Sequence, residues 1–430
     1  MGFIYGLAVF LVIFEGIIIQ CEGGSTISRE SAPEQIKKVI KPIFPKNVMD
    51  MILSKTDFET ILSVIRDLGL PAEYDVMSGR LQESVIVIMP ELNNPICGSY
   101  HLGKPYITIA NYKGLTTFSK KFGDQVKKIA IYLAKRIDPR REITERFIKK
   151  YAKNFEALSI MGFHCDRFWN EISGGGSSIT FPEVKNFQLN GDIDRHKFKL
   201  NLIFPKLEYL TLIGKVADEN CFANVKGLKE LTLCTDSIEE QKLVGIFQRN
   251  NGLTVMRLTE PKTTETMHSI AKHLTKLKAL AVESPGEQFL LRAKNGTVSK
   301  LGSVIHFGIS FNKMVEIFGI GDLHLSFDMP HLKKLTLHGH QADDRIIKFI
   351  QHFKELEILE FFLHDYGPVE CIKKLKHIRE FTTTFDEANF DSLKKMFQNF
   401  DKTFKLQTIK FLRFDESLFQ MYEEEMKIIN

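Results

Sequence analysis

A glycine-rich segment, GSYHLGK at residues 98–104, is the part of this 430-residue chain whose spacing is closest to a known chemistry. Two glycines and a lysine at this spacing cradle phosphates in nucleotide-binding loops, where a Ser or Thr hydroxyl follows and holds magnesium. Pro105 occupies that position here, and the next residues predict a strand where the motif must open a helix. We therefore predict a turn between strands and no nucleotide cofactor.

Two other groups of residues are candidates for metal binding or nucleophilic catalysis. His324, His331, His338 and His340 are close in sequence, but no carboxylate or thiol shares their spacing, so we predict no metal site. The residues His164-Cys-Asp are adjacent in sequence, whereas a nucleophilic triad must be adjacent in space. No GxSxG or HExxH motif is present. We therefore expect a protein that is not an enzyme and that uses no cofactor.

A basic segment covers residues 120–153, where 12 Lys or Arg residues stand against four acidic ones. The whole chain carries a formal charge of only +5. Such a segment can attract nucleic acid or an acidic partner. Its Ile and Phe spacing suits core packing, and aromatic residues for base stacking are not interleaved with the charges. The preferred interpretation is a solvated face on outer helices, and no nucleic-acid partner is expected.

Composition and cysteine usage exclude several classes of protein. Hydrophobic residues at 43% and charged residues at 26% exclude wholesale disorder. A mean hydropathy of −0.10 excludes a protein with many membrane spans. The six cysteines are scattered without a CxxC pair, which supports neither a zinc ribbon nor a disulfide scaffold. This scatter favours a reducing compartment, and thus a cytoplasmic or nuclear protein.

The first 24 residues indicate a different location. From residue 3 to residue 19 the chain is apolar, interrupted only by glycine and by Glu15, and small and polar residues follow. This segment is similar to a secretory signal peptide or a membrane anchor. No Lys or Arg precedes it, and cleavage after Gly23 would leave five cysteines, an odd number for a secreted protein. A leader or anchor and an atypical N-terminal extension both remain open, with a secreted protein as the alternative location.

Apolar triplets at positions i, i+3 and i+5 organise the remainder of the chain. They recur every 21 to 29 residues, and helical periodicity lies between them at 238–249, 263–274, 343–353 and 389–400. One such unit cannot bury its apolar face alone, so units must stack into an α/β solenoid with parallel strands on the concave face and helices on the convex face. The triplets begin at Phe155, Val184, Leu207, Leu228, Leu253, Leu277, Val304, Leu332, Leu356, Ile378 and Leu406, with Val126 as a further candidate.

These units resemble leucine-rich repeat proteins of the longer, helix-bearing subclass, over residues 155–412 or 126–412. The family's usual Asn or Cys, eight residues after the first Leu, is missing from the six stronger units, and Asn312 is the one match among the weaker units. We therefore expect degenerate repeats with irregular curvature. The 35 Phe residues, against one Trp, are predicted to fill the space between helices and strands.

Residues 25–70 are predicted to form short helices, and residues 40–70 are similar to an F-box. The resemblance rests on Pro45, Ile52, Leu53 and Leu62, although Asn47 stands where an acidic residue is usual. In F-box proteins with leucine-rich repeats, these helices bind the Skp adaptor of a cullin ubiquitin ligase and the repeats capture the substrate. The alternative is an amphipathic cap that shields the first repeat. Residues 71–125 are expected to form a mixed connecting or capping region, and 126–430 the solenoid.

Binding in such a solenoid is expected on the concave face, through the strand residues that alternate with the buried ones. This set is mixed in charge and rich in Thr, which suits a protein ligand; alternatively, its members are solvent-facing residues with good β propensity. The resemblance implies a non-catalytic substrate-recognition subunit of a cullin-type ubiquitin ligase, and the alternative is a secreted or membrane-tethered ligand-binding repeat protein. The principal candidates are Tyr209, Thr211, Glu230, Thr232, Arg257, Lys334, Thr336, His338, Glu360 and Phe362, with Thr259, Glu283, Thr382, Thr384 and Lys410 in the wider set.

Overall fold

The structure is a computed structural model that describes most of the repeat region. The described residues are 47–48, 77, 79–88, 106–109, 112–133, 141–162, 168, 179–191, 199–215, 219–234, 238–291, 296–310, 325–341, 344–365, 377–385 and 407–414. The hydrophobic segment 1–24, the GSYHLGK segment and the F-box residues Pro45, Ile52, Leu53 and Leu62 lie outside these ranges. Among the described helices, none is both long and apolar enough to span a bilayer.

One parallel sheet of 14 strands runs through the described chain. Its strands, in chain order, are β1 (Val85–Ile88), β2 (Tyr106–Ile109), β3 (Lys128–Leu133), β4 (Ala157–Gly162), β5 (Asn186–Asn190), β6 (Tyr209–Ile213), β7 (Glu230–Cys234), β8 (Val255–Thr259), β9 (Ala279–Glu283), β11 (His306–Ser310), β13 (Lys334–Gln341), β14 (Ile358–Asp365), β15 (Glu380–Phe385) and β16 (Thr408–Phe414). Two short strands, β10 (Ser299–Lys300) and β12 (Phe327–Asp328), pair separately with each other.

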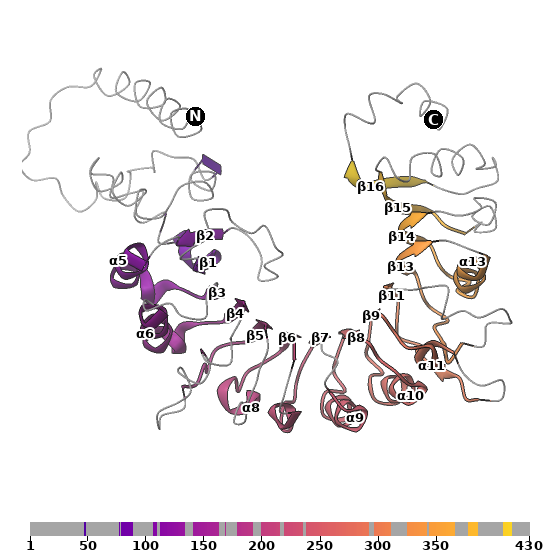
Figure 1. The fold of residues 1–430 in the computed structure, drawn as a ribbon, viewed down its shortest axis with the longest axis horizontal. Helices are drawn as coiled ribbons and strands as arrows, with labels where there is room; N and C mark the ends of the chain where they lie inside the picture. The colour runs from indigo at the N-terminus through magenta and orange to yellow at the C-terminus, as the bar shows by residue number, and fades with distance from the viewer. Residues whose placement is uncertain are drawn as a thin grey trace, which may run out of the picture.

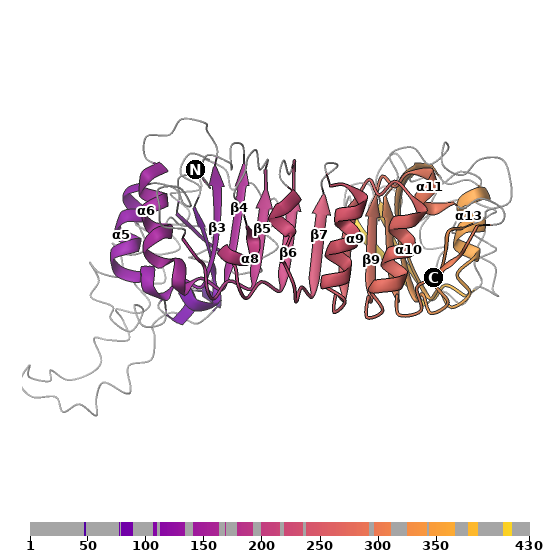
Figure 2. The ribbon, with the colours of Figure 1, turned by 90° about the horizontal axis from the view of Figure 1, so that it is seen from below.

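The sheet bends into an arc, with its strands on the inner side and its helices on the outer side (Figure 1). Seen from below, the helices form a layer in front of the sheet (Figure 2). The described helices are α5 (Tyr112–Phe122), α6 (Arg141–Tyr151), α8 (Leu200–Ile203), α9 (Glu240–Arg249), α10 (Thr264–His273), α11 (Glu287–Leu290) and α13 (Asp344–Gln351), with 3-10 turns η2 (Gly123–Gln125), η3 (Ala152–Asn154) and η4 (Glu219–Phe222). The predicted α/β class with one large parallel sheet is confirmed.

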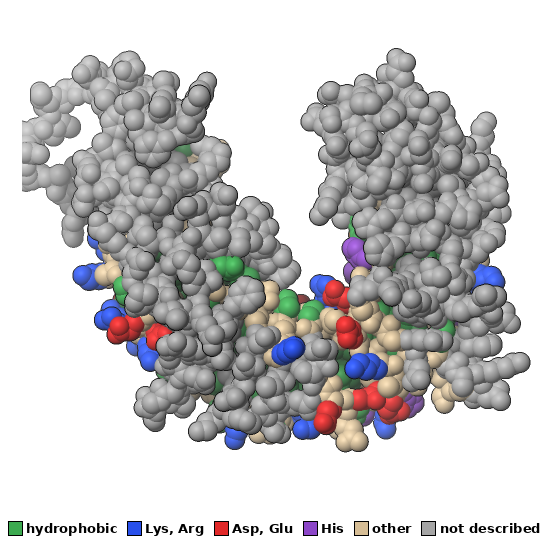
Figure 3. Space-filling model, viewed as in Figure 1, with side chains coloured by type: hydrophobic (Ala, Val, Ile, Leu, Met, Phe, Trp, Pro, Cys, Tyr) green, Lys and Arg blue, Asp and Glu red, His purple; other side chains and the backbone are tan. Residues whose placement is uncertain are grey.

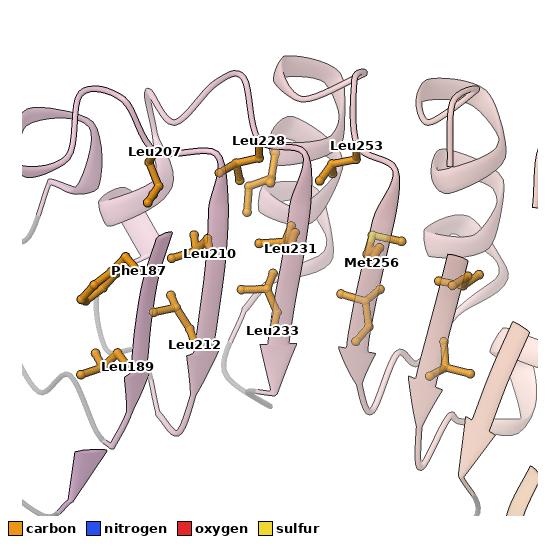
Figure 4. Close-up of a cluster of buried hydrophobic side chains, with 14 of the residues drawn as sticks. Phe187, Leu189, Leu207, Leu210, Leu212, Leu228, Leu231, Leu233, Leu253 and Met256 are labelled. Carbon is orange, nitrogen blue, oxygen red and sulfur yellow. The ribbon is translucent and has the colours of Figure 1, made fainter. Parts of the chain in front are cut away.

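The apolar triplets locate the strands correctly. The second and third residues of all eleven triplets lie in a strand of the sheet, from β4 to β16. Leu210 and Leu212 of β6 are each 1% exposed, and in the pairing with β7 they lie opposite Leu231 and Leu233. Figure 4 shows these side chains in rows on one face of the sheet. The rows form the main core, between the sheet and the helices.

Phenylalanine fills the core between successive units, as predicted. The ring centroid of Phe204, which follows α8, lies 4.4 Å from that of Phe187 on β5 and 5.3 Å from that of Phe181. Phe181 in turn stacks at 6.4 Å on Phe155, in the preceding unit. All four side chains are at most 1% exposed. Stacked rings of this size bury a large apolar area in each thin layer.

The N-terminal end of the sheet departs from simple stacking. The spatial order there is β2, β1, β3, so β1 pairs with both of the strands that follow it in the chain. At this end the inner face is apolar, because Val85, Val87 and Ala130 point away from the main core and are still at most 1% exposed. Both faces of the sheet are therefore covered at β1 and β3.

A recurring turn follows the strands. Gly191 and Gly214, directly after β5 and β6, have φ of 153° and 123°, and their N–H groups donate to the last carbonyls of the next strands. After β8 and β9 the same position holds Glu260 (φ 51°) and Ser284 (φ 48°), with equivalent hydrogen bonds of 2.7 Å. A left-handed conformation costs a residue with a Cβ about 1–2 kcal/mol. Two units therefore keep a side chain at a strained position.

Replacing Glu260 with glycine is expected to raise the free energy of unfolding by about 0.5–1 kcal/mol. The left-handed strain disappears, and the greater entropy of glycine in the unfolded chain offsets part of the gain. Urea denaturation followed by circular dichroism measures the change. Lys262→Gly, two residues further along at an ordinary φ, is the control and should give no gain. An unchanged or lower stability of Glu260→Gly would show that the turn is not strained.

Candidate binding surface on the inner face of the sheet

The inner face of the sheet between β6 and β14 presents three rows of side chains. Pairing without register shifts from β6 to β14 places alternate residues of neighbouring strands opposite each other, and these are partly or fully exposed. The middle row consists of Thr211, Thr232, Arg257, Ala281, Gly308, Thr336 and Glu360. We call the inward-facing residues of β6, β7, β8, β9, β11, β13 and β14 the open inner face.

Burial limits this surface at both ends. The next residue of the middle row on β5 is Gln188, which is 3% exposed and accepts a hydrogen bond of 3.3 Å from the Ser159 hydroxyl. At the other end, Thr382 on β15 is 4% exposed. Because both neighbours of the row are covered, the accessible part of the middle row ends at β6 and at β14.

All ten principal repeat-region candidates lie on the open inner face. Glu230, Arg257 and His338 are exposed and the other seven are partly buried. The alternation predicted from the sequence is therefore correct for these strands. Thr382 and Lys410 lie beyond the open part, on β15 and β16, while Thr259 and Glu283 belong to it.

Polar side chains on the open inner face form two bonded groups. In the first group, Arg257 on β8 forms an ion pair of 3.2 Å with Glu283 on β9, and the Thr259 hydroxyl donates to the same carboxylate at 3.5 Å. The second group is built around Glu360 on β14. This carboxylate forms an ion pair of 2.7 Å with Lys334 and accepts a 2.8 Å hydrogen bond from the Thr336 hydroxyl.

The surface between the two groups has almost no side-chain volume. Ala281 on β9 and Gly308 on β11 are paired there, and a Cβ on Gly308 would lie 3.4 Å from that of Ala281, an ordinary contact. In the same row, Arg257 on β8 lies next to Ala281, and Thr336 on β13 lies next to Gly308. The sheet between the two bonded groups is therefore nearly uncovered by side chains at Ala281 and Gly308.

Sequence reasoning missed three residues of this region, namely Ala281, Gly308 and His306. His306 on β11 contacts the Thr336 hydroxyl through Nε2 at 3.1 Å, which connects it to the Glu360 group. All three occupy the same alternate positions as the predicted candidates, in β9 and in the weaker unit that begins at Val304. The available signal was strand alternation, applied to every unit and to small residues as well as to polar ones.

Both histidines on this surface are held toward the neutral form. Partial burial lowers the pKa of His306, and the positive charge of Lys334 lowers it further while Glu360 opposes the shift. Partial burial also lowers the pKa of His338, aided by Arg257 and opposed by Glu360 and Glu283. The ring of His338 lies 4.7 Å from that of Phe362. At neutral pH both imidazoles on the open inner face are therefore uncharged.

We expect both imidazole pKa values to lie below 6.5, the ordinary histidine value, in an NMR titration of the full chain. Since the unfolded chain then binds more protons than the folded one, these groups stabilise the fold above pH 6.5. That contribution is lost as the pH falls from 6.5 through the folded-state pKa values. His306→Gln should reduce the loss of stability between pH 7.5 and 5.5. A titration of His306 at or above 6.5 would contradict the burial argument.

The charges on the open inner face nearly balance. This face carries two cations, Arg257 and Lys334, and three anions, Glu230, Glu283 and Glu360, so its formal charge is −1. Over the surface seen in Figure 3, acidic and basic side chains are likewise interspersed.

In the part of the chain that the structure describes, no group of three or more His, Cys, Asp or Glu side chains is placed to hold a metal ion. No family model matches the chain, and comparison with curated proteins finds no relative.

Proposed function

We propose that this chain is a non-catalytic binding protein of the leucine-rich repeat type that holds a protein ligand on its open inner face. The observation that carries the proposal is the accessible stretch from β6 to β14, bounded on both sides by buried residues of the same row. The strands on the inner side of the arc and the helices on its outer side support the repeat assignment (Figure 1).

The chemistry of this surface favours a protein over a nucleic acid. A phosphate backbone needs an excess of cations, whereas the open inner face carries a formal charge of −1. Tyr209, Ile213 and Val255 give the β6–β8 side a partly exposed apolar area. The β8–β14 side carries the ion pairs and the neutral imidazoles. Apolar contacts beside satisfied polar groups are the usual composition of a protein–protein interface.

Affinity purification of the tagged full chain tests the role of the inner face. We expect the double variant Arg257→Ala, Phe362→Ala to reduce the recovery of at least one co-purifying protein tenfold or more, because Arg and aromatic side chains dominate interface energies. Arg146→Ala is the control, since this exposed residue lies on α6, on the outer side of the arc. Calorimetry with the purified partner should then show the same tenfold loss.

The design keeps folding and binding separate. Circular dichroism of each variant should match the parent chain, because Arg257 is exposed and Phe362 is partly buried on an open surface. If every co-purifying protein is retained by the inner-face variant, or lost equally with Arg146→Ala, the open inner face is not the binding surface.

We also propose that the captured protein is delivered to a cullin-type ubiquitin ligase through residues 40–70. Support for this step is the F-box resemblance at Pro45, Ile52, Leu53 and Leu62, which lie outside the described residues. The full chain should bind purified Skp adaptor, and Leu53→Glu should abolish that binding while the inner-face variant retains it. Absence of adaptor binding by the parent chain would reject this step and leave the inner-face proposal in place.

A further inference from the structure

A cavity of about 150 Å³ lies at the carboxyl ends of β7 and β8, beside the open inner face. Leu233, Leu243 and Leu258 give it an apolar base. Thr259 lines the cavity and is also an inward-facing residue of β8, so the cavity adjoins the binding surface. A cavity of this volume holds a group of about six heavy atoms, because benzene fits one of similar size.

Acidic groups outnumber basic groups in the cavity wall. Glu240 at the start of α9 and Glu260 after β8 both line it, against one ammonium, that of Lys262. The Glu240 carboxylate accepts hydrogen bonds from the hydroxyls of Thr263 and Thr266, which fix its position. An apolar base with a fixed carboxylate above it matches an aliphatic chain that ends in a cation.

The turn at Glu260 brings the second carboxylate to the cavity. Gly191 and Gly214 occupy the equivalent turn position in two earlier units, whereas Glu260 places a carboxylate side chain at a left-handed φ of 51°. Ser284 keeps a similar φ of 48° without lining the cavity, so this conformation belongs to the turn, and its role here is to place the Glu260 side chain. The strained residue is one of the two carboxylates that line the cavity.

We propose that this cavity binds a Lys or Arg side chain of the protein ligand, with the aliphatic stem against Leu233 and Leu258 and the cation between Glu240 and Glu260. The inference rests on the proposed function for the origin of the side chain. The cavity itself is testable without any protein partner. It places one basic residue of the ligand at the edge of β8, next to the apolar side of the open inner face.

The probe for this site is n-butylammonium, with 1-butanol as its neutral counterpart, each titrated into the full chain with labelled Leu methyl groups. We expect n-butylammonium to shift the methyl signals of Leu233, Leu243 and Leu258 and to bind at least tenfold more tightly than 1-butanol. Glu240→Gln keeps an oxygen acceptor for the threonine hydroxyls but removes the charge. In that variant the two probes should bind within about twofold of each other.

Two further variants complete the test. Glu265→Gln, an exposed carboxylate on α10 that does not line the cavity, should leave the tenfold preference intact. Glu260→Gly should weaken n-butylammonium binding at least threefold while the fold becomes more stable, which separates lost binding from lost structure. Equal affinity for the two probes in the parent chain, or no methyl shifts with either, overturns the proposal. In both cases partner capture through Arg257 and Phe362 remains testable on its own.

Discussion

Replacing Phe204 with alanine is expected to lower the free energy of unfolding by about 4 kcal/mol. The side chain is 1% exposed, and its ring contacts those of Phe187 and Phe181 on either side. Truncation removes the transfer free energy of the ring and leaves a cavity that the rigid sheet cannot close. Both neighbouring rings also lose a stacking partner, worth about 0.5–1.5 kcal/mol for each pair.

Leu202 provides a matched control for Phe204. It lies two residues away on α8 and is 60% exposed, so Leu202→Ala should change stability by no more than about 0.5 kcal/mol. Urea denaturation measures the global effect, and hydrogen exchange of peptides that cover β5 and β6 locates it. Equal losses of stability for the two variants would show that the packing of Phe204 does not stabilise the core. Phe204→Leu should recover more than half of the loss, because it restores most of the volume.

The Asn250→Ala variant is expected to lose about 3 kcal/mol of stability through hydrogen bonding alone. This buried side chain accepts from the backbone N–H of Leu228 at 3.0 Å and donates to the carbonyls of Val225 and Ile246 at 3.0 and 2.9 Å. Each buried group left without a partner costs about 1–3 kcal/mol. The amide thus ties the end of α9 to the segment that leads into β7.

The neighbouring residue serves as the control for Asn250. Asn251 is exposed, and its replacement by alanine should change the urea midpoint very little. Asn250→Asp keeps the acceptor oxygen but replaces the donor NH2 with a second oxygen, so it should also be destabilised and should not restore the parent stability. A loss below 1 kcal/mol for Asn250→Ala would mean that water replaces the missing amide.

Strand positions could be predicted from the sequence because each strand buries two apolar residues at a fixed spacing. That pattern depends only on local alternation and on the need for Leu210, Leu212 and their equivalents to reach one core. The helices at 240–249, 264–273 and 344–351 were predicted to within two residues for the same reason. The reversed order of β2, β1 and β3 could not be predicted, since it is a choice among long-range pairings of similar strands.

Polar interactions were less accessible to sequence reasoning. The family's usual asparagine, eight residues after the first Leu, is missing from the stronger units, whereas the structural asparagine Asn250 lies at the C-terminus of a helix. The inward orientation of the candidate residues followed from strand alternation, but the pairing of Arg257 with Glu283 depends on how neighbouring strands align. The strained turn at Glu260 and the cavity beside it depend on backbone angles that no residue pattern encodes.

The order of the strands in space has a consequence for synthesis on the ribosome. From β4 to β16 each strand of the sheet pairs with the sheet strand made just before it, so each new strand can add to one that already exists. The reversal at β1 makes the start different, because β1 gains its second neighbour only when β3 has been made. A nascent chain released before residue 133 therefore lacks part of β3, the second neighbour of β1. Each later release point leaves a chain with further strands added one at a time.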